Sequence, residues 1–92
     1  DVEIVNCTVR DGQRVNVDVE GVVEVANTSQ ATATVDVRWS VPAVGEQVGS
    51  GTVTVGGGDS NTLVVALDLS KIPTDPGAQR EYDVVYDYDV AF

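Results

Sequence analysis

Four aspartates are the side chains of this sequence best suited to hold a metal ion: Asp59, Asp75, Asp87 and Asp89. The first follows a run of glycines, the second lies between two prolines, and the last two belong to an alternating acidic segment near the C-terminus. Calcium needs about six to eight oxygen ligands at roughly 2.3–2.6 Å, whereas alternate carboxylates of one strand lie roughly 6.5–7 Å apart. We therefore interpret the acidic segment as a solvated face and the other two aspartates as turn residues, so all four are weak metal candidates.

Catalytic chemistry has few candidate residues in this chain. The sequence contains no histidine, which excludes a Ser-His-Asp triad, a Cys-His pair and histidine metal sites. A Ser-Lys dyad would have to use Lys71, the only lysine, and nothing in the sequence brings a serine to it. Hydrolysis by paired carboxylates needs a cleft that a sandwich of this size rarely has. We predict that the protein is not an enzyme and carries no cofactor.

One cysteine and two asparagines complete the candidate sites. Cys7 is the only cysteine, so it cannot form an internal disulfide, and its alternation with valines predicts a small buried side chain. Asn6 and Asn27 each begin an N-x-[ST] pattern for glycosylation, which matters only in an exported chain. Because Asn27 lies in a predicted turn, we expect it to be the more accessible of the two. The alternative is that its side chain caps the turn.

The charge of the chain limits its partners. Its 15 acidic and five basic residues give a formal net charge of −10. Such a surface repels phosphate backbones and anionic headgroups, and no apolar run is long enough to cross a bilayer, so we expect neither nucleic-acid binding nor direct membrane insertion. An acidic, lysine-poor surface rich in valine and threonine is typical of extreme halophiles. A haloarchaeal origin is our hypothesis, and an ordinary acidic secreted domain is the alternative.

Alternating valines predict strands in the first half of the chain, because β-branched residues suit a pleated surface. Residues 2–9 form a first predicted strand, with a bulge or a change of sheet near Ile4, where the apolar residues change parity. Residues 14–27 keep one apolar phase but are long for a single strand, so we expect a bend at Gly21 or two strands. Residues 31–41 show the clearest alternation and place Trp39 in the core.

Shorter elements are expected after Pro42, because proline ends a strand. They are a loop or short edge strand at 42–50, a strand at 51–55, a glycine-rich turn at 56–60, a strand from Leu63 to Leu69 and a crossover loop at 70–79.

The last segment, residues 81–92, has mostly apolar residues at even positions and mostly acidic residues at odd positions. Core packing is therefore our first interpretation of Tyr82, Tyr86 and Tyr88. Two alternatives are stacking against sugar rings and an exposed edge at 88–92 that pairs with a neighbouring domain.

Together these patterns predict an all-β fold. We expect an antiparallel Ig-like or fibronectin-III-like β-sandwich of about seven strands, with residues 1–92 in a single domain that is monomeric in isolation. The sequence begins at Asp1 rather than Met and has no signal-type apolar run, from which we expect a mature or excised piece of a longer precursor.

Two stretches resemble a known family. Residues 23–41, VEVANTSQATATVDVRWSV, resemble the turn and alternating strand of the CARDB and FxLYD Ig-like domains of prokaryotic surface and secreted proteins. Residues 56–67, GGGDSNTLVVAL, are similar to the Gly-Ser turn and strand that precede the last hairpin of those domains. The long segment 14–27 and the lack of an aromatic-rich hairpin near residue 45 depart from the family pattern. The resemblance implies a seven-stranded spacer or adhesion module and brings no catalytic residues.

The expected function is non-enzymatic: a structural or protein-interaction domain, adhesion or spacer, of an exported, salt-adapted protein at the cell surface or outside the cell. Its partner would be another protein or a neighbouring domain, met by loops 42–50 and 56–61 or by an unpaired edge strand. The alternatives are a module that binds a cation or a small ligand, and a subunit of an extracellular filament or virion.

Overall fold

Most of the described residues lie in strands. The structure is a computed structural model that describes residues 1–12, 18–72 and 83–92. In this part of the chain the strands are β1 (Val2–Asp11), β2 (Val19–Asn27), β3 (Ala33–Val41), β4 (Glu46–Val55), β5 (Ser60–Ala66) and β6 (Val85–Ala91). One short 3-10 helix, η1 (Leu69–Lys71), follows β5. The prediction of an all-β fold is confirmed.

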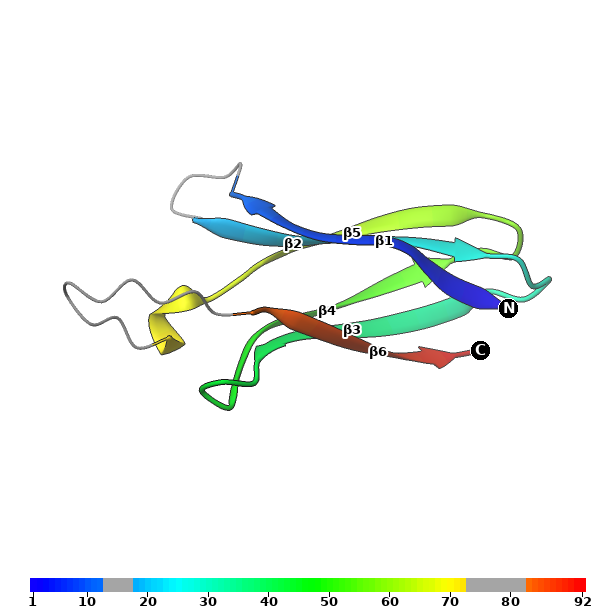
Figure 1. Cartoon of the computed structure of the whole chain (residues 1–92). Helices are drawn as coiled ribbons and strands as arrows, with labels where there is room; N and C mark the ends of the chain where they lie inside the picture. Colours follow the sequence, from blue (N-terminus) through cyan, green and yellow to red (C-terminus); the bar gives the residue numbers. More distant parts are fainter. Residues whose placement is uncertain (13–17, 73–82) are drawn as a thin grey trace.

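The strands form two antiparallel sheets that stack as a sandwich (Figure 1). One sheet has the order β1-β2-β5 and the other has the order β4-β3-β6. The described residues thus contain six strands where the sequence predicted about seven. Both termini lie at the same end of the sandwich (Figure 1).

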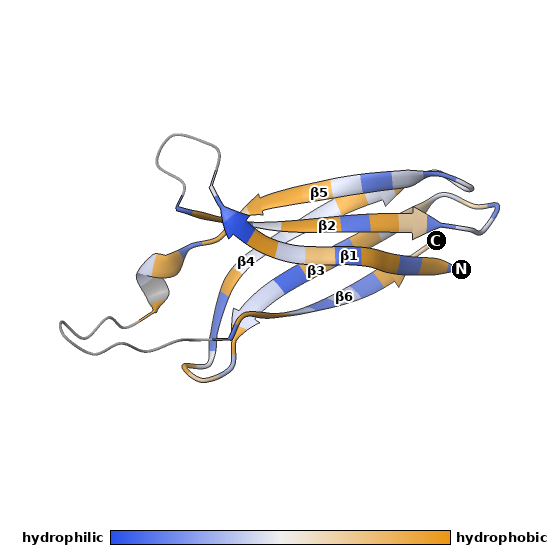
Figure 2. Cartoon of the chain, turned by 45° about the horizontal axis from the view of Figure 1, so that its top comes forward, coloured by the Kyte–Doolittle hydropathy of each residue, from blue (hydrophilic) through white to orange (hydrophobic). Residues whose placement is uncertain are grey.

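Valines from both sheets fill the space between them. The alternate residues of β3 that point inward, from Ala33 to Val41, are at most 1% exposed, and Trp39 is the largest side chain among them. They pack with Val23 and Val25 of β2, which are fully buried. Apolar residues accordingly alternate with polar ones along the strands (Figure 2). The predicted alternation of segment 31–41 and the core position of Trp39 are confirmed, although Ala31 itself is exposed and lies before β3.

Gly21 has a role that the sequence interpretation missed. A break into two strands at this residue is wrong, because β2 continues through it from Val19 to Asn27. A Cβ atom at Gly21 would lie only 2.5 Å from Cε2 of Trp39, so the glycine makes room for the indole ring against the backbone of β2. The missing side chain is thus a packing requirement between the sheets.

One side of the sandwich is closed by β4 and β5. A Cβ at Gly49 would lie 2.6 Å from Leu67, and one at Gly51 would lie 2.7 Å from Val65. These glycines therefore let the apolar side chains of β5 and of the residue after it rest directly on the β4 backbone. We call this the closed side, defined by Gly49, Gly51, Leu63, Val65 and Leu67.

Two predictions for this part of the chain need refinement. Of residues 42–50, predicted as a loop or a short edge strand, 42–45 form a turn and 46–50 belong to β4, an edge strand that continues to Val55. The turn places Gly45 at φ +68°, a left-handed conformation that glycine adopts without strain. Leu69 does not belong to a strand, since β5 ends at Ala66 and Leu69 begins η1, where it is 37% exposed.

The predicted irregularity in the first strand is confirmed. The register between β1 and β2 shifts between Ile4 and Asn6, which leaves Val5 as the extra residue of a β-bulge. The bulge lets Ile4 and Cys7 both face the core despite their opposite parity, and both pack against it. The predictions that fall on residues 13–17 and 73–82 lie outside the described residues.

Candidate functional site

Exposed apolar side chains gather on the two edge strands opposite the closed side. Among the described residues, the exposed large apolar side chains are Val5, Val9, Leu69, Val85, Tyr86, Tyr88 and Phe92. All except Leu69 belong to β1, to β6 or to the residue that follows β6. We call the side of the sandwich bounded by β1 and β6 the open side. These two strands lie on the same side of the molecule in both views (Figures 1 and 2).

The inner row of β6 is only partly covered. Tyr86 lies opposite Trp39 of β3, and Tyr88 lies opposite Val37. Paired residues share a face, so both tyrosines face the same way as the buried residues of β3. They are nevertheless 42% and 40% exposed, and their rings stack with centroids 6.5 Å apart. Packing of these tyrosines inside the core is therefore wrong, although Val84 and Val90 do pack against it. Tyr82 lies outside the described residues.

The outer row of β6 carries paired charges. Arg38 of β3 contacts both acidic residues of the strand: its Nε lies 2.7 Å from Oδ1 of Asp87, and its Nη2 lies 3.0 Å from Oδ2 of Asp89. Hydrogen bonding to Asp89, helped by Asp87, raises the pKa of Arg38 above its ordinary value, so the guanidinium is charged at any relevant pH. Asp36 is directly opposite Asp89 on the same face. The three aspartates and one arginine leave this face negative.

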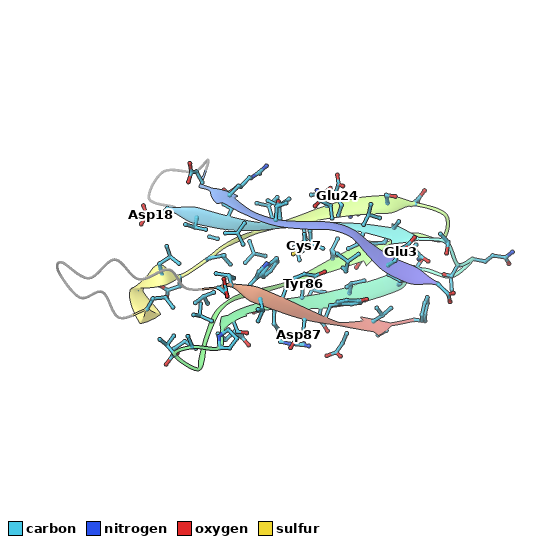
Figure 3. The ribbon with its side chains drawn as sticks, viewed as in Figure 1. Glu3, Cys7, Asp18, Glu24, Tyr86 and Asp87 are labelled. Atoms are coloured by element: carbon cyan, nitrogen blue, oxygen red, sulfur yellow. The ribbon has the colours of Figure 1, made fainter. Side chains whose placement is uncertain are left out.

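The inner row of β1 carries the single thiol. Cys7 is partly buried, and Val9, which lies opposite Gly21, is 44% exposed. Figure 3 shows Cys7 and Tyr86 on the facing sides of the two sheets, with Asp87 on the outer side of β6. Burial raises the pKa of the Cys7 thiol, and the indole N–H of Trp39 partly offsets that effect. Nε1 of Trp39 makes no hydrogen bond of normal geometry with any described residue.

The four metal candidates do not come together in the described structure. No group of three or more His, Cys, Asp or Glu side chains that could hold a metal ion occurs among the described residues. Asp59 belongs to the turn between β4 and β5, where its backbone N–H donates to the carbonyl of Gly56. Asp87 and Asp89 bind Arg38, and Asp75 lies outside the described residues.

The two glycosylation candidates differ in exposure, and in the opposite order to that expected. Asn27 is 1% exposed, and its Nδ2 donates to the carbonyls of Ala31 and Val55 at 2.8 and 3.0 Å. Its Oδ1 accepts hydrogen bonds from the backbone N–H and the hydroxyl of Ser29. Asn27 thus has the turn-capping role, and Asn6, exposed on β1, is the more accessible of the two.

A hollow of about 370 Å³ lies beside the bulge of β1. It is lined by Val5, Glu24, Val25, Ser60, Asn61 and Thr62. Its lining is mostly polar, and Asn61 is held in place by a hydrogen bond from its Nδ2 to the carbonyl of Thr54. The hollow could take a small polar molecule, but it contains no pair of groups arranged for acid–base or nucleophilic chemistry.

Comparisons with protein-family models, curated proteins and solved structures gave no match. Among the described residues, no helix is both long and apolar enough to cross a membrane. The surface that stands out is therefore defined by its physical properties: two edge strands with uncovered apolar residues, of which Val5, Val9 and Val85 were not singled out from the sequence. The parity change near Ile4 was the one signal that pointed to Val5.

Proposed function

We propose that this chain is a non-enzymatic structural or protein-interaction domain of an exported, salt-adapted protein, an Ig-like sandwich of the adhesion or spacer kind. It works outside the cell or at the cell surface and contacts another protein or a neighbouring domain through its open side. The observation that carries this proposal is the concentration of exposed apolar side chains on β1, β6 and the residue after β6.

The physical reason is that exposed edge strands with apolar side chains are costly to leave in water. An edge strand offers unpaired backbone donors and acceptors, and natural proteins usually shorten it, charge it or cover it. Of these side chains, Val9, Tyr86 and Tyr88 lie on the inner rows of the open side, whereas Val85 pairs with Ser40 on the outer row and Val5 lines the hollow. Exposed apolar side chains that gather on one side of a soluble protein mark a contact with another molecule more often than isolated ones do. The rims of protein interfaces are polar, as is the acidic outer row of β6.

The test uses Nile red, a neutral dye whose fluorescence rises in apolar surroundings. A neutral probe is needed because the net charge of −10 repels anionic dyes. We expect the intact chain to enhance the fluorescence and the double variant Val9→Ser/Tyr88→Ser to lose most of the enhancement.

Leu69→Ser is the matched control, since Leu69 is also exposed but lies away from the two edges. It should leave the signal unchanged. Absence of enhancement with the intact chain, or equal losses in both variants, would contradict an open apolar side and with it the proposed function.

Salt adaptation has its own test. At about 0.1 M ionic strength the Debye length is about 10 Å, and at 1 M it is about 3 Å, so concentrated salt screens the repulsion among the 15 acidic residues. We expect the free energy of unfolding in urea to rise from low to molar potassium chloride. A free energy that falls over this range would favour the ordinary acidic secreted domain.

A small-ligand module is the second candidate, and the hollow beside the bulge supports it. Its volume of about 370 Å³ lies at the lower end of the range of ligand pockets, roughly 300–1,000 Å³. Titration with small polyols, followed by the amide NMR shifts of Glu24 and Thr62, tests this candidate. Saturable shifts confined to the hollow and lost in Glu24→Gln would support it, and diffuse shifts would contradict it.

A further inference from the structure

The edge of β6 differs from the other edge of the open side in its regularity. The pairing of β6 with β3 runs from Val85 to Ala91 without a register shift, so β6 keeps an even pleat. The edge of β1 is interrupted by the bulge at Val5, and bulges are a common device against pairing at an edge. An added strand would therefore meet a regular ladder at β6 and an irregular one at β1.

We propose that β6 accepts an extended strand of a partner protein whose residues alternate between apolar and basic side chains. The proposal rests on the proposed function and specifies its partner. The added strand would extend the sheet β4-β3-β6 by one strand through backbone hydrogen bonds, and its side chains would continue the two rows of β6.

The inner row of β6 calls for apolar partners. Tyr86 and Tyr88 are about two-fifths exposed, and their stacked rings offer a flat apolar surface. Directly opposite residues of neighbouring strands share a face and come within contact distance of each other. Valine or isoleucine opposite the two tyrosines would cover them and close part of the open side.

The outer row calls for basic partners. The side chains of Asp87 and Asp89 are 73% and 76% exposed, and one arginine serves both carboxylates. Arg38 approaches them from the β3 side, which leaves the side away from β3 open to a second cation. Opposite charges paired across strands stabilise a sheet by about 0.2–1 kcal/mol each, so lysine or arginine at alternate positions fits this row.

A second copy of the chain fits this edge less well. Antiparallel pairing of two β6 strands about Tyr88 would match the inner rows but would place Asp87 of each copy opposite Asp89 of the other. Like charges directly opposite each other destabilise a sheet, and each copy carries a net charge of −10. Charge complementarity thus selects a basic strand over self-pairing.

The experiment titrates the full chain with a blocked heptapeptide of alternating Val and Lys at about 0.01 M ionic strength, where the Debye length is about 30 Å. Binding is followed by calorimetry and by amide NMR shifts. Two control peptides are used, one of alternating Val and Glu and one of alternating Gly and Lys with the same positive charge. We expect the Val/Lys peptide to bind at least about tenfold more tightly than either control, with shifts along β6 and slower exchange of its edge amides.

Two sets of variants localise the binding. Tyr88→Ser should weaken it about tenfold, and Asp87→Asn/Asp89→Asn should weaken it about three- to tenfold. The matched control, Glu46→Gln/Asp59→Asn, removes the same number of charges elsewhere and should change the affinity less than about twofold. Because the two sets act on opposite rows of the strand, a folding defect in one leaves the other informative.

Several results would overturn the inference. Equal binding of the Gly/Lys peptide would show non-specific charge attraction, shifts on β1 would place the site at the other edge, and a dimer through β6 in sedimentation at low salt would make a second copy the occupant. Failure of the peptide alongside a positive Nile red result would reject the alternating basic strand and leave the proposed function standing. Failure of both would reject both.

Discussion

The closed and open sides of the sandwich use the same kind of strand in opposite ways. On the closed side, Gly49 and Gly51 have no side chains, so Leu67 and Val65 can lie against the β4 backbone. Leu67 is only 6% exposed. On the open side, Tyr86 and Tyr88 point the same way as the buried row of β3 but stay about two-fifths exposed. The difference is that the β4 backbone covers Leu67 and Val65, whereas no described strand covers the two tyrosines from the outer edge of β6.

This contrast shows that an alternating pattern specifies the face of a strand and leaves its coverage undetermined. Both Leu67 and Tyr88 have the parity of inward residues. Leu67 lies directly on the β4 backbone because Gly49 has no side chain there, while no described strand pairs with the outer edge of β6. An apolar residue at an edge is therefore either a core residue or a contact surface, according to the neighbouring strand.

The largest expected effect comes from truncating one apolar side chain on each side. Leu67→Ala should lower the free energy of unfolding by about 2–5 kcal/mol, because it leaves a cavity against β4. Tyr88→Ala should lower it by no more than about 1 kcal/mol, because much of the ring is already in water. Urea denaturation measures both values. Equal losses would mean that the open side is covered in solution.

The next effect tests the close contact between β2 and the core. Gly21→Ala should destabilise the protein by about 1–3 kcal/mol, because the added Cβ meets the rigid, buried ring of Trp39 at 2.5 Å. Gly56→Ala is the matched control: its Cβ would meet only the carboxylate of Asp59, at 2.8 Å, and that exposed side chain can move away. Thermal unfolding followed by tryptophan fluorescence compares the two. A Gly21→Ala protein as stable as the control would contradict this packing.

A comparison of the two candidate asparagines should give an effect similar in size to that of Gly21→Ala. Asn27→Ala removes the donor to the carbonyls of Ala31 and Val55 and should cost about 1–3 kcal/mol, with faster amide exchange at Ser29. Asn6→Ala, on the exposed edge strand, should change stability by no more than about 0.5 kcal/mol. A reversal of this order would mean that the capping network is absent in solution.

The smallest effect concerns the thiol on the open side. Burial raises the pKa of Cys7, so the neutral thiol is favoured in the folded protein. The rate of alkylation by iodoacetamide should therefore rise with pH along a curve that is displaced to higher pH than that of the urea-unfolded chain. The contribution of this pKa shift to the free energy of unfolding is constant below the ordinary thiol pKa and is lost as the pH rises through the raised pKa. Coincident curves for the folded and unfolded chains would contradict the burial of the sulfur.

Several elements of the fold were predictable from local patterns. Segment 31–41 alternates so cleanly that β3 and the buried position of Trp39 follow from it, and the parity change near Ile4 predicts the bulge of β1. For segment 42–50 the sequence left a loop and a short edge strand open, because its two glycines and its proline are typical of loops, and residues 46–50 belong to the edge strand β4. In the folded chain, Gly49 lies within β4, and its missing side chain leaves room for Leu67.

The candidate site was less predictable than the fold. The sequence raised an exposed C-terminal edge as an alternative, but it favoured core packing of Tyr86 and Tyr88 because of their parity. For Asn27 the sequence offered both an accessible acceptor and a turn cap, and the structure has the cap: its amide donates to the carbonyl of Ala31 in the same turn and to that of Val55 in β4. The exposure of the tyrosines and the contact with Val55 both depend on distant parts of the chain.

By itself, the sequence determined that the chain folds into strands, which side of each strand is apolar, and that the surface is acidic. These properties follow from side-chain type and from the two-residue period of an extended backbone. Only the tertiary structure decided which strands are edges, which glycines admit a neighbour's side chain, and which inward residues stay in water. Those outcomes depend on the order in which the strands pair and on how the two sheets stack. Both are determined by contacts between residues far apart in the chain.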